Sequence, residues 1–412
     1  MTAHVALPAE GAAYLGTHAE ALEAARQLAG AWESVAADID AERRVPRAEL
    51  RALERSGLLG ITIPGPHGGP GLSTQTLIEV FLILGAADTA LAQIPQNHFD
   101  FVDTLLVASP QTQRLLYGEV LAGARFGNAI AEPGRRSRAD LKTTIVEDGD
   151  GFVLNGAKYF STGALTAKWV PVHALHADGR VRTAYVANGT PGLDIRADWD
   201  AFGQRATFSG TTVLTNVRVP RDQVVDRSLG DPGLLTAQFA GNQLIHAAIE
   251  AGSVLGALRR AANWLGEAEV NGRPPSPVLL ARLGDLLVEA EAARALVRRA
   301  ARLVDVALER PSPAAEAPLA ANIAVDEAKS LAYDLGPAVT AELLDFAPSG
   351  VAAGRLRLDR FWRNTRTHSM HDPVRWRQAF VGDFHLNGRV SADLRAKLKL
   401  PDPSIPDIVS GT

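Results

Sequence analysis

The sequence predicts an α+β protein in which a β domain lies between two helical domains. Apolar residues recur at helical spacing in the first and last parts of the chain and at strand spacing in the middle. A chain of 412 residues can bury a large core, but it normally divides into two or three subdomains. We expect an N-terminal helical domain (1–124), a central β domain (125–230) and a C-terminal helical bundle domain with a tail (231–412).

Composition excludes several classes of protein. Hydrophobic residues make up 46% of the chain, and 42 Lys and Arg residues balance 46 Asp and Glu residues, so no single-sign field favours nucleic acid. The absence of cysteine excludes disulfides, thiolate metal ligands and a cysteine nucleophile. The N-terminal residues lack a signal-peptide pattern, and no stretch approaches the roughly 18 apolar residues of a membrane span. We expect a cytoplasmic protein without nucleic-acid or membrane partners.

The first third of the chain predicts helices around one Gly/Pro-rich loop. EALEAARQLAGAWESVAADI (20–39) carries an apolar stripe, and Pro46 occupies the favoured first turn of the next helix. LGITIPGPHGGPGLS (59–73) is the loop. Ser73 is expected to cap one long apolar helix over 74–95.

The middle of the chain predicts short strands. TTIVEDGDGFVLNG indicates two strands around a DGDG turn, and later β-rich segments are separated by turn residues. The expected strands lie within 143–156, 168–176, 182–187 and 211–219.

The last part of the chain predicts long helices that form a bundle. The helical period covers 247–265, 277–309 and 320–344, with alternating apolar and charged faces. His246, on an apolar helix face, is expected to be a core histidine. The final residues, PDPSIPDIVSGT (401–412), form a Pro-rich tail.

General-purpose catalytic motifs are absent, since the chain has no G-x-G-x-x-G after a strand, Walker A loop, G-x-S-x-G elbow or H-E-x-x-H. RTHSMHDP (366–373) instead brings His368 and His371 three residues apart, beside Asp372. These side chains suit a metal, but they lack a further well-spaced ligand, so we expect no metal site.

Four motifs occur along the chain in a fixed order: LLGITIPGPHGGPGLS (58–73), AIAEPGRRSRAD (129–140), GFVLNGAKYFSTG (151–163) and FGQRATFSGTTVLTNVRVP (202–220). They resemble the motifs of the acyl-CoA dehydrogenase superfamily, in that family's order. This resemblance implies a helical N-terminal domain, a central β-barrel-like domain and a C-terminal four-helix bundle, with a flavin ring held between the last two. It also implies a homotetramer.

The chain departs from the dehydrogenases at two functional positions. The family's C-terminal Glu base aligns with Asp372, which precedes Pro373, and an alternative base position falls near Asn242. Neither supplies the Glu that α-proton abstraction requires. The family's R-x-x-F-G grip on the FAD pyrophosphate is replaced by Ala268 and Asn271, and LLDFAPSGVAAG lacks paired glycines. The adenine half of FAD therefore loses its site.

Four stretches accompany these departures: IPQNHF (94–99), YFSTGALTAKWVPV (159–172), WDAFGQRATFSGT (199–211) and RFWRNTRTHSMHDPVRW (360–376). They resemble a subgroup of the family, the two-component FMN monooxygenases such as dibenzothiophene monooxygenase and the sulfur-acquisition oxidoreductases. The resemblance implies that a separate NAD(P)H:flavin reductase supplies reduced FMN (FMNH2). With O2 as co-substrate, a C4a-(hydro)peroxyflavin would then oxygenate a small organosulfur compound, such as a sulfone or thioether.

The resemblance assigns roles to polar residues. Ser161 at the family's Thr/Ser position and Asn128 would donate hydrogen bonds to developing negative charge. His371 is the expected proton donor, because a histidine exchanges its proton near neutral pH, and His98 would close the other side. Each has a structural interpretation as well: His368 and His371 as a pair at a helix C-terminus, His98 as a bonded boundary residue, and Ser161 and Asn128 as turn residues.

The remaining site residues exclude water and bind the cofactor. Trp199, Phe160 and Phe99 are expected walls, since the oxygenated flavin must be kept dry. Arg273 or Arg363 would bind the FMN phosphate through a bidentate fork. Further expected cofactor contacts are Ile130, Ala131, Thr162 and His368.

Three functions remain open. The first is the FMN-dependent monooxygenase, from which an amino-sugar N-oxygenase of the same fold is not separable by sequence. The second is an FAD-dependent acyl-CoA dehydrogenase with Asp372 as base. The third is a non-enzymatic binding protein, which predicts no turnover with any reduced flavin.

Overall fold

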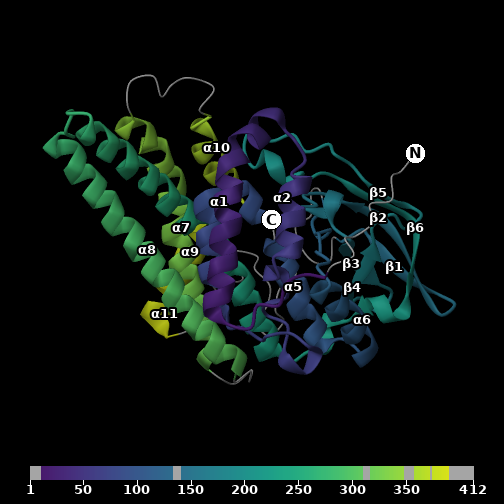
Figure 1. Ribbon diagram of the computed structural model, residues 1–412. Helices are drawn as coiled ribbons and strands as arrows, with labels where there is room; N and C mark the ends of the chain where they lie inside the picture. Colours follow the sequence, from purple (N-terminus) through teal and green to yellow (C-terminus); the bar gives the residue numbers. More distant parts are fainter. Residues whose placement is uncertain (1–10, 133–140, 310–315, 348–356, 372–373, 389–412) are drawn as a thin grey trace.

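The computed structural model describes residues 11–132, 141–309, 316–347, 357–371 and 374–388. It has helices at both ends of the sequence and a sheet between them, as the sequence predicts (Figure 1). The Pro-rich tail, Asp372 and Pro373 lie outside the described residues. Within the described residues, no helix is long and apolar enough to cross a membrane.

The N-terminal helices begin at well-defined caps. Thr17 and Glu20 form a reciprocal capping box at the start of α1, and the Ser73 hydroxyl accepts from Thr76 N. The single helix expected over 74–95 is wrong at one point: Asp88 is extended, and its carboxylate accepts from the N–H groups of Ala90 and Leu91, which starts a new helix. The bounds are α1 His18–Glu42, α2 Arg47–Arg55, α3 Thr74–Ala87, α4 Thr89–Gln93, α5 Gln96–Thr104 and α6 Pro110–Leu121.

The β domain is one seven-stranded sheet with the order β5-β6-β2-β1-β3-β4-β7. Neighbouring strands are antiparallel except β1 and β3, which are parallel. The expected strands are confirmed, and the structure adds β5 and β7, which are too short to show alternation in the sequence. The bounds are β1 Thr144–Asp148, β2 Gly151–Lys158, β3 Trp169–His176, β4 Val181–Ala187, β5 Leu193–Ile195, β6 Thr212–Pro220 and β7 Val224–Val225.

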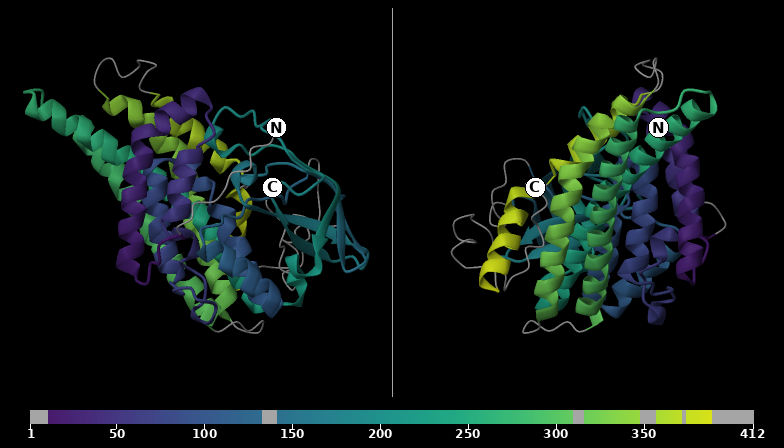
Figure 2. Two further views of the ribbon diagram at one scale, coloured as in Figure 1. Left: turned by 45° about the vertical axis from the view of Figure 1, so that its right-hand side comes forward. Right: turned by 90° about the vertical axis from the view of Figure 1, so that its left-hand side faces the viewer.

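The C-terminal helices pack into a bundle in which α7 contacts α3, α8 and α9 (Figure 2). A Cβ at Gly256 would lie 2.1 Å from the carbonyl oxygen of Ala86, so glycine is required where α7 crosses α3. The paired ends of α7 and α8 project beyond the body of the molecule. The bounds are α7 Pro232–Val270, α8 Pro277–Glu309, α9 Glu316–Glu342, α10 Asp359–Ser369 and α11 Val374–Asn387.

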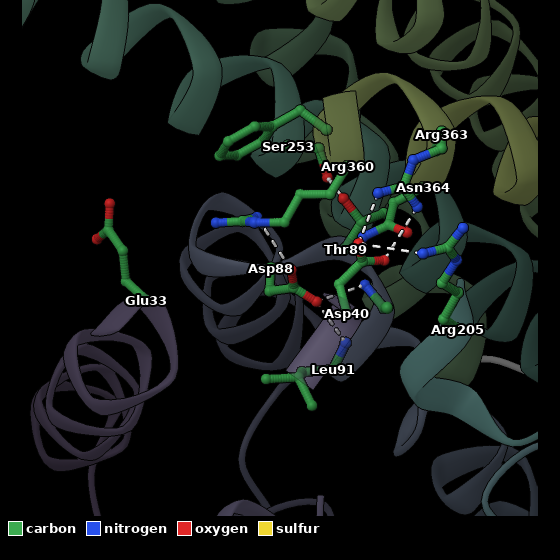
Figure 3. Close-up of polar contacts among 12 residues, drawn as sticks. Glu33, Asp40, Asp88, Thr89, Leu91, Arg205, Ser253, Arg360, Arg363 and Asn364 are labelled. Atoms are coloured by element: carbon green, nitrogen blue, oxygen red, sulfur yellow. Dashed lines mark hydrogen bonds and ion pairs between the residues drawn. The ribbon is translucent and has the colours of Figure 1, made fainter. Parts of the chain in front are cut away.

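Buried ion pairs attach α10 to the N-terminal helices (Figure 3). Arg363 forms a bidentate pair with Asp40 of α1, with Nη1 3.0 Å from Oδ1. Arg360 donates to Asp88 at the α3–α4 junction, at 3.2 Å. These contacts fix the helix whose far end carries His368.

Candidate active site

A cavity of about 520 Å³ lies between the sheet domain and the helical bundle. Its wall combines residues of α5, the 128–131 segment, the end of β2, the 199–209 segment, α7 and the end of α10. Residues predicted from distant motifs therefore meet at one place. Those predicted residues that line it are Asn128, Ile130, Ala131, Phe160, Thr162, Trp199, His368 and His371.

The 128–131 segment runs beside the sheet and contributes Asn128, Ile130 and Ala131 to the cavity wall. Ala129 pairs with Val172 of β3 and lies in the core, whereas Asn128 and Ile130 line the cavity. The Asn128 Oδ1 accepts from Ile130 N at 3.1 Å, and its Nδ2 faces the carbonyl oxygen of Phe160 at 3.5 Å. Asn128 is thus held in place while its amide remains at the cavity wall.

Aromatic side chains form another part of the wall. Phe160 is 51% exposed and has a left-handed backbone (φ 53°), an unusual state for a bulky residue and one that occurs at functional sites. Its ring meets Trp199 edge to face at 5.8 Å, and Trp199 Nε1 donates to the Gln204 carbonyl oxygen at 2.9 Å. Phe99, also expected as a wall, is instead buried against Phe81 and is not among the lining residues.

Thr162 reaches the cavity and Ser161 does not. Ser161 is fully buried, and its Oγ has no hydrogen-bond partner among the described residues. Thr162 lines the cavity with its Oγ1 2.8 Å from the Ser209 hydroxyl. The hydroxyl at the cavity wall is therefore that of Thr162, one residue after the expected Ser161, at a tight turn in which Thr162 N donates to the Phe160 carbonyl oxygen.

The structure places His98 outside the cavity wall. Its Nε2 lies 3.0 Å from the Leu59 carbonyl oxygen, and its Nδ1 accepts from Phe126 N at 3.0 Å. Both ring nitrogens are occupied by backbone, and burial lowers the pKa of His98 to about 3. His98 therefore links the loop before α3 to the start of the β domain and has no nitrogen left for a ligand.

Neither arginine expected at the phosphate lines the cavity. Arg363 is committed to Asp40, Asp359 and the Phe202 carbonyl oxygen. Arg273 is exposed in the turn between α7 and α8. The arginine that does line the cavity is Arg227, which was not predicted and which pairs with Asp100 at 2.9 Å.

Loop 199–209 docks onto α10 through glycine and amide contacts. A Cβ at Gly203 would lie 1.9 Å from the Arg363 carbonyl oxygen, so only glycine allows this approach. Gln204 N donates to Asn364 Oδ1 at 2.7 Å. The loop and α10, which both contribute residues to the wall, are thus directly joined.

Three histidines meet at the bundle side of the cavity: His246, His368 and His371. His246 was expected in the core; it is buried, but it also lines the cavity. Its Nδ1 is 2.9 Å from Nε2 of His368, and its ring stacks on His371 with centroids 4.5 Å apart. Burial lowers the pKa values of His246 and His368 well below the usual range.

Glu250 stands behind these histidines. Its Oε1 is 2.8 Å from Nδ1 of His368, it has no exposed surface, and burial raises its pKa well above the usual range. Glu250 and His246 are four residues apart, which places them on one face of a helix. That spacing was visible in the sequence, but the partner His368 on another helix was not.

The residues present fit a flavin ring. The volume lies within the range of cofactor sites, and the wall combines the aromatic side chains of Tyr159, Phe160, Trp199, Phe202 and Phe239 with polar side chains. Thr162 and Asn128 supply a hydroxyl and an amide on the sheet side, and the imidazoles supply proton donors on the bundle side. The cavity can therefore bind a planar, partly polar ring and exchange protons with it.

Comparisons with known proteins cover the same segments. The N-terminal, middle and C-terminal domain models of acyl-CoA dehydrogenase match residues 17–122, 127–217 and 233–372. Dibenzothiophene monooxygenase of Rhodococcus erythropolis is 30% identical over 89% of this chain and 93% of its own length. The probable FMNH2-dependent monooxygenase SfnC of Pseudomonas putida is 30% identical over 90% and 95%.

A solved structure agrees with these sequence matches. FMN-bound TdsC from Paenibacillus sp. A11-2 has a TM-score of 0.83 and 28% identity, covering 90% of this chain and 98% of that one. The domain models together match most of the chain, in the order that the structure shows. The chain therefore belongs to the acyl-CoA dehydrogenase family.

Proposed function

We propose that this protein is an FMNH2-dependent, two-component monooxygenase that transfers one oxygen atom of O2 to a small organosulfur substrate. The observation that carries the proposal is the group of three histidines at the cavity wall, beside the position where the dehydrogenases' C-terminal Glu base aligns with the shorter Asp372. The alternative base position is Asn242, a cavity residue without a carboxylate. The likeness to dibenzothiophene monooxygenase, SfnC and FMN-bound TdsC supports the same class.

Reduced FMN, when bound in the cavity, would supply the electrons that activate O2. Thr162 and Asn128 would hydrogen-bond to the flavin ring from the sheet side, and Phe160 and Trp199 would cover it. His371 would hold the proton that the second oxygen atom of O2 requires when the first is transferred to the substrate. Water must be excluded from such a site, because it diverts activated oxygen to hydrogen peroxide.

The substrate and partner follow from the same class. An aromatic wall favours an apolar thioether or sulfone over a charged compound. A separate NAD(P)H:flavin reductase is the expected source of reduced FMN, and a homotetramer is the expected assembly. Both stay predictions of the family likeness.

The proposal is tested by turnover with labelled oxygen. The protein, FMN, NADH and a flavin reductase are incubated under ¹⁸O₂ with dibenzothiophene, its sulfone and dialkyl sulfides, and products are analysed by mass spectrometry. One ¹⁸O per turnover in a sulfur product supports the proposal. Reduction of a dye by acyl-CoA with FAD, or oxygenation of an amino sugar only, would replace it by the corresponding alternative.

A further inference from the structure

A chain of hydrogen bonds connects the cavity to a carboxyl that does not reach it. Glu250 Oε1 is 2.8 Å from Nδ1 of His368, and Nε2 of His368 is 2.9 Å from Nδ1 of His246. Nε2 of His246 has no hydrogen-bond partner among the described residues, and the side chain lines the cavity. The Glu250 end of this chain is therefore enclosed in the bundle, and the His246 end faces the cavity.

Glu250 is enclosed by the helix packed against it. It has no exposed surface, and its Oε2 has no hydrogen-bond partner among the described residues. A Cβ at residue 336 would lie 2.2 Å from this oxygen, so Gly336 of α9 provides the space that the carboxyl occupies. An isolated carboxylate in such a place is costly, which favours the protonated acid.

The two hydrogen bonds determine how protons are shared. A protonated Glu250 donates to Nδ1 of His368, and Nε2–H of His368 donates to Nδ1 of His246, which leaves the proton of His246 on Nε2. When Nε2 of His246 releases its proton to the cavity, Nδ1 of His246 takes one from His368, and His368 takes one from Glu250. One proton leaves at His246, one negative charge remains on Glu250, and both imidazoles stay neutral.

Charged and titratable groups from neighbouring helices face this chain. Lys329 of α9 donates to Gln243 Oε1 at 2.6 Å and lies 4.9 Å from the Tyr333 ring centroid. The Tyr333 ring in turn lies 5.5 Å from that of His368. Lys329 favours the ionised form of Glu250, which lowers the cost of releasing the proton. The other facing groups are His371 after α10, Arg377 of α11 and its ion-pair partner Asp326 of α9.

We propose that Glu250 is a positioning residue that sets the tautomers of His368 and His246 and stores a second proton, which His246 delivers to the cavity in addition to the one that His371 holds. The proposal rests on the proposed function only for the identity of the proton acceptor. The flavin-free protein already contains the neutral carboxyl that is hydrogen-bonded in series with two neutral imidazoles. This arrangement is therefore measurable without turnover.

The first test uses flavin-free protein at neutral pH. The infrared difference spectrum between wild type and Glu250→Gln should contain the C=O band of one protonated carboxyl. Proteins with ¹⁵N-labelled histidine should show the ring signals of His368 and His246, assigned by single substitution, in neutral tautomers that change in Glu250→Gln. Ser253→Ala is the control, because Ser253 is buried on the same helix but bonds to Thr89. Absence of the acid band, or unchanged ring signals in Glu250→Gln, overturns the proposal.

The second test measures coupling, the fraction of reduced FMN oxidised that yields product rather than hydrogen peroxide. Glu250→Gln should lower coupled turnover about 10- to 100-fold, the usual cost of removing a group that orients a reacting histidine, with reduced-FMN affinity retained. Gly336→Ala keeps the carboxyl but displaces it, so its coupling should fall as well. Unchanged coupling in both variants overturns the proton-storage role. If the spectra behave as expected but wild type oxygenates nothing, the proposed function fails and the tautomer-setting role stands.

Discussion

Nδ1 of His246 and Nε2 of His368 lie 2.9 Å apart, although the two residues belong to different helices and are 122 positions apart in the sequence. The contact exists because α10 is held against α7 while ion pairs fix its other side to α1 and to the α3–α4 junction. The chemistry expected of the cavity thus depends on how α10 is docked.

His371→Asn should lower coupled oxygenation about 100-fold or more, within the range expected for loss of a general acid. Binding of reduced FMN should change by no more than a few fold, because His371 is expected to act on the reacting oxygen. Product and hydrogen peroxide are measured at saturating reduced FMN. A proportional loss of FMN affinity and turnover would mean that His371 serves binding instead.

Thr162 and Ser161 provide a matched pair of neighbouring hydroxyls. Thr162→Val should weaken reduced-FMN binding about tenfold, since it removes a hydroxyl at the cavity wall. Ser161→Ala should leave binding unchanged and leave stability equal or slightly higher, because it removes a buried hydroxyl without a partner among the described residues. Fluorescence titration measures the affinities. The reverse ranking would restore Ser161 as the flavin contact.

The Asp40–Arg363 pair should be a large contributor to stability. Asp40→Ala leaves the Arg363 guanidinium, which is 12% exposed, without its bidentate partner, and should lower the free energy of unfolding by about 3 kcal/mol. Urea denaturation measures the change. The exposed pair between Arg26 and Glu23 is the control, so Glu23→Ala should cost less than about 1 kcal/mol. Equal effects of the two substitutions would mean that the buried pair does not anchor α10.

His98 should make stability depend on pH. Its pKa is about 3 in the folded protein and near 6.5 when unfolded, so the unfolded state binds the proton first as pH falls. The contribution of neutral His98 to the free energy of unfolding is fully present above pH 6.5 and is lost progressively toward pH 3, by up to about 5 kcal/mol. His98→Gln lacks this pH-dependent loss. The difference in free energy of unfolding between wild type and variant should therefore narrow between pH 7 and pH 4. Urea midpoints that fall in parallel would contradict this.

The sequence predicts most of the fold because its periodic segments are long. The apolar pattern over 277–309 coincides with α8, whereas the break at Asp88 was missed because an aspartate capping a new helix leaves the apolar pattern intact. The sequence identified residues of the cavity wall where a family motif fixes their positions. It did not identify their partners, since Glu250 meets His368 only through the packing of separate helices. The predicted role of His98 conflicts with the hydrogen bonds of its ring to the backbone of Leu59 and Phe126.

The most direct measurement is an anaerobic titration of the purified protein with reduced FMN and, separately, with reduced FAD, followed by mixing with oxygenated buffer containing dibenzothiophene. We predict tighter binding of reduced FMN than of reduced FAD, and an oxygenated sulfur product whose yield falls about 100-fold or more in His371→Asn. Tighter binding of reduced FAD, with all oxygen recovered as hydrogen peroxide, would mean that the protein is not an FMNH2-dependent monooxygenase.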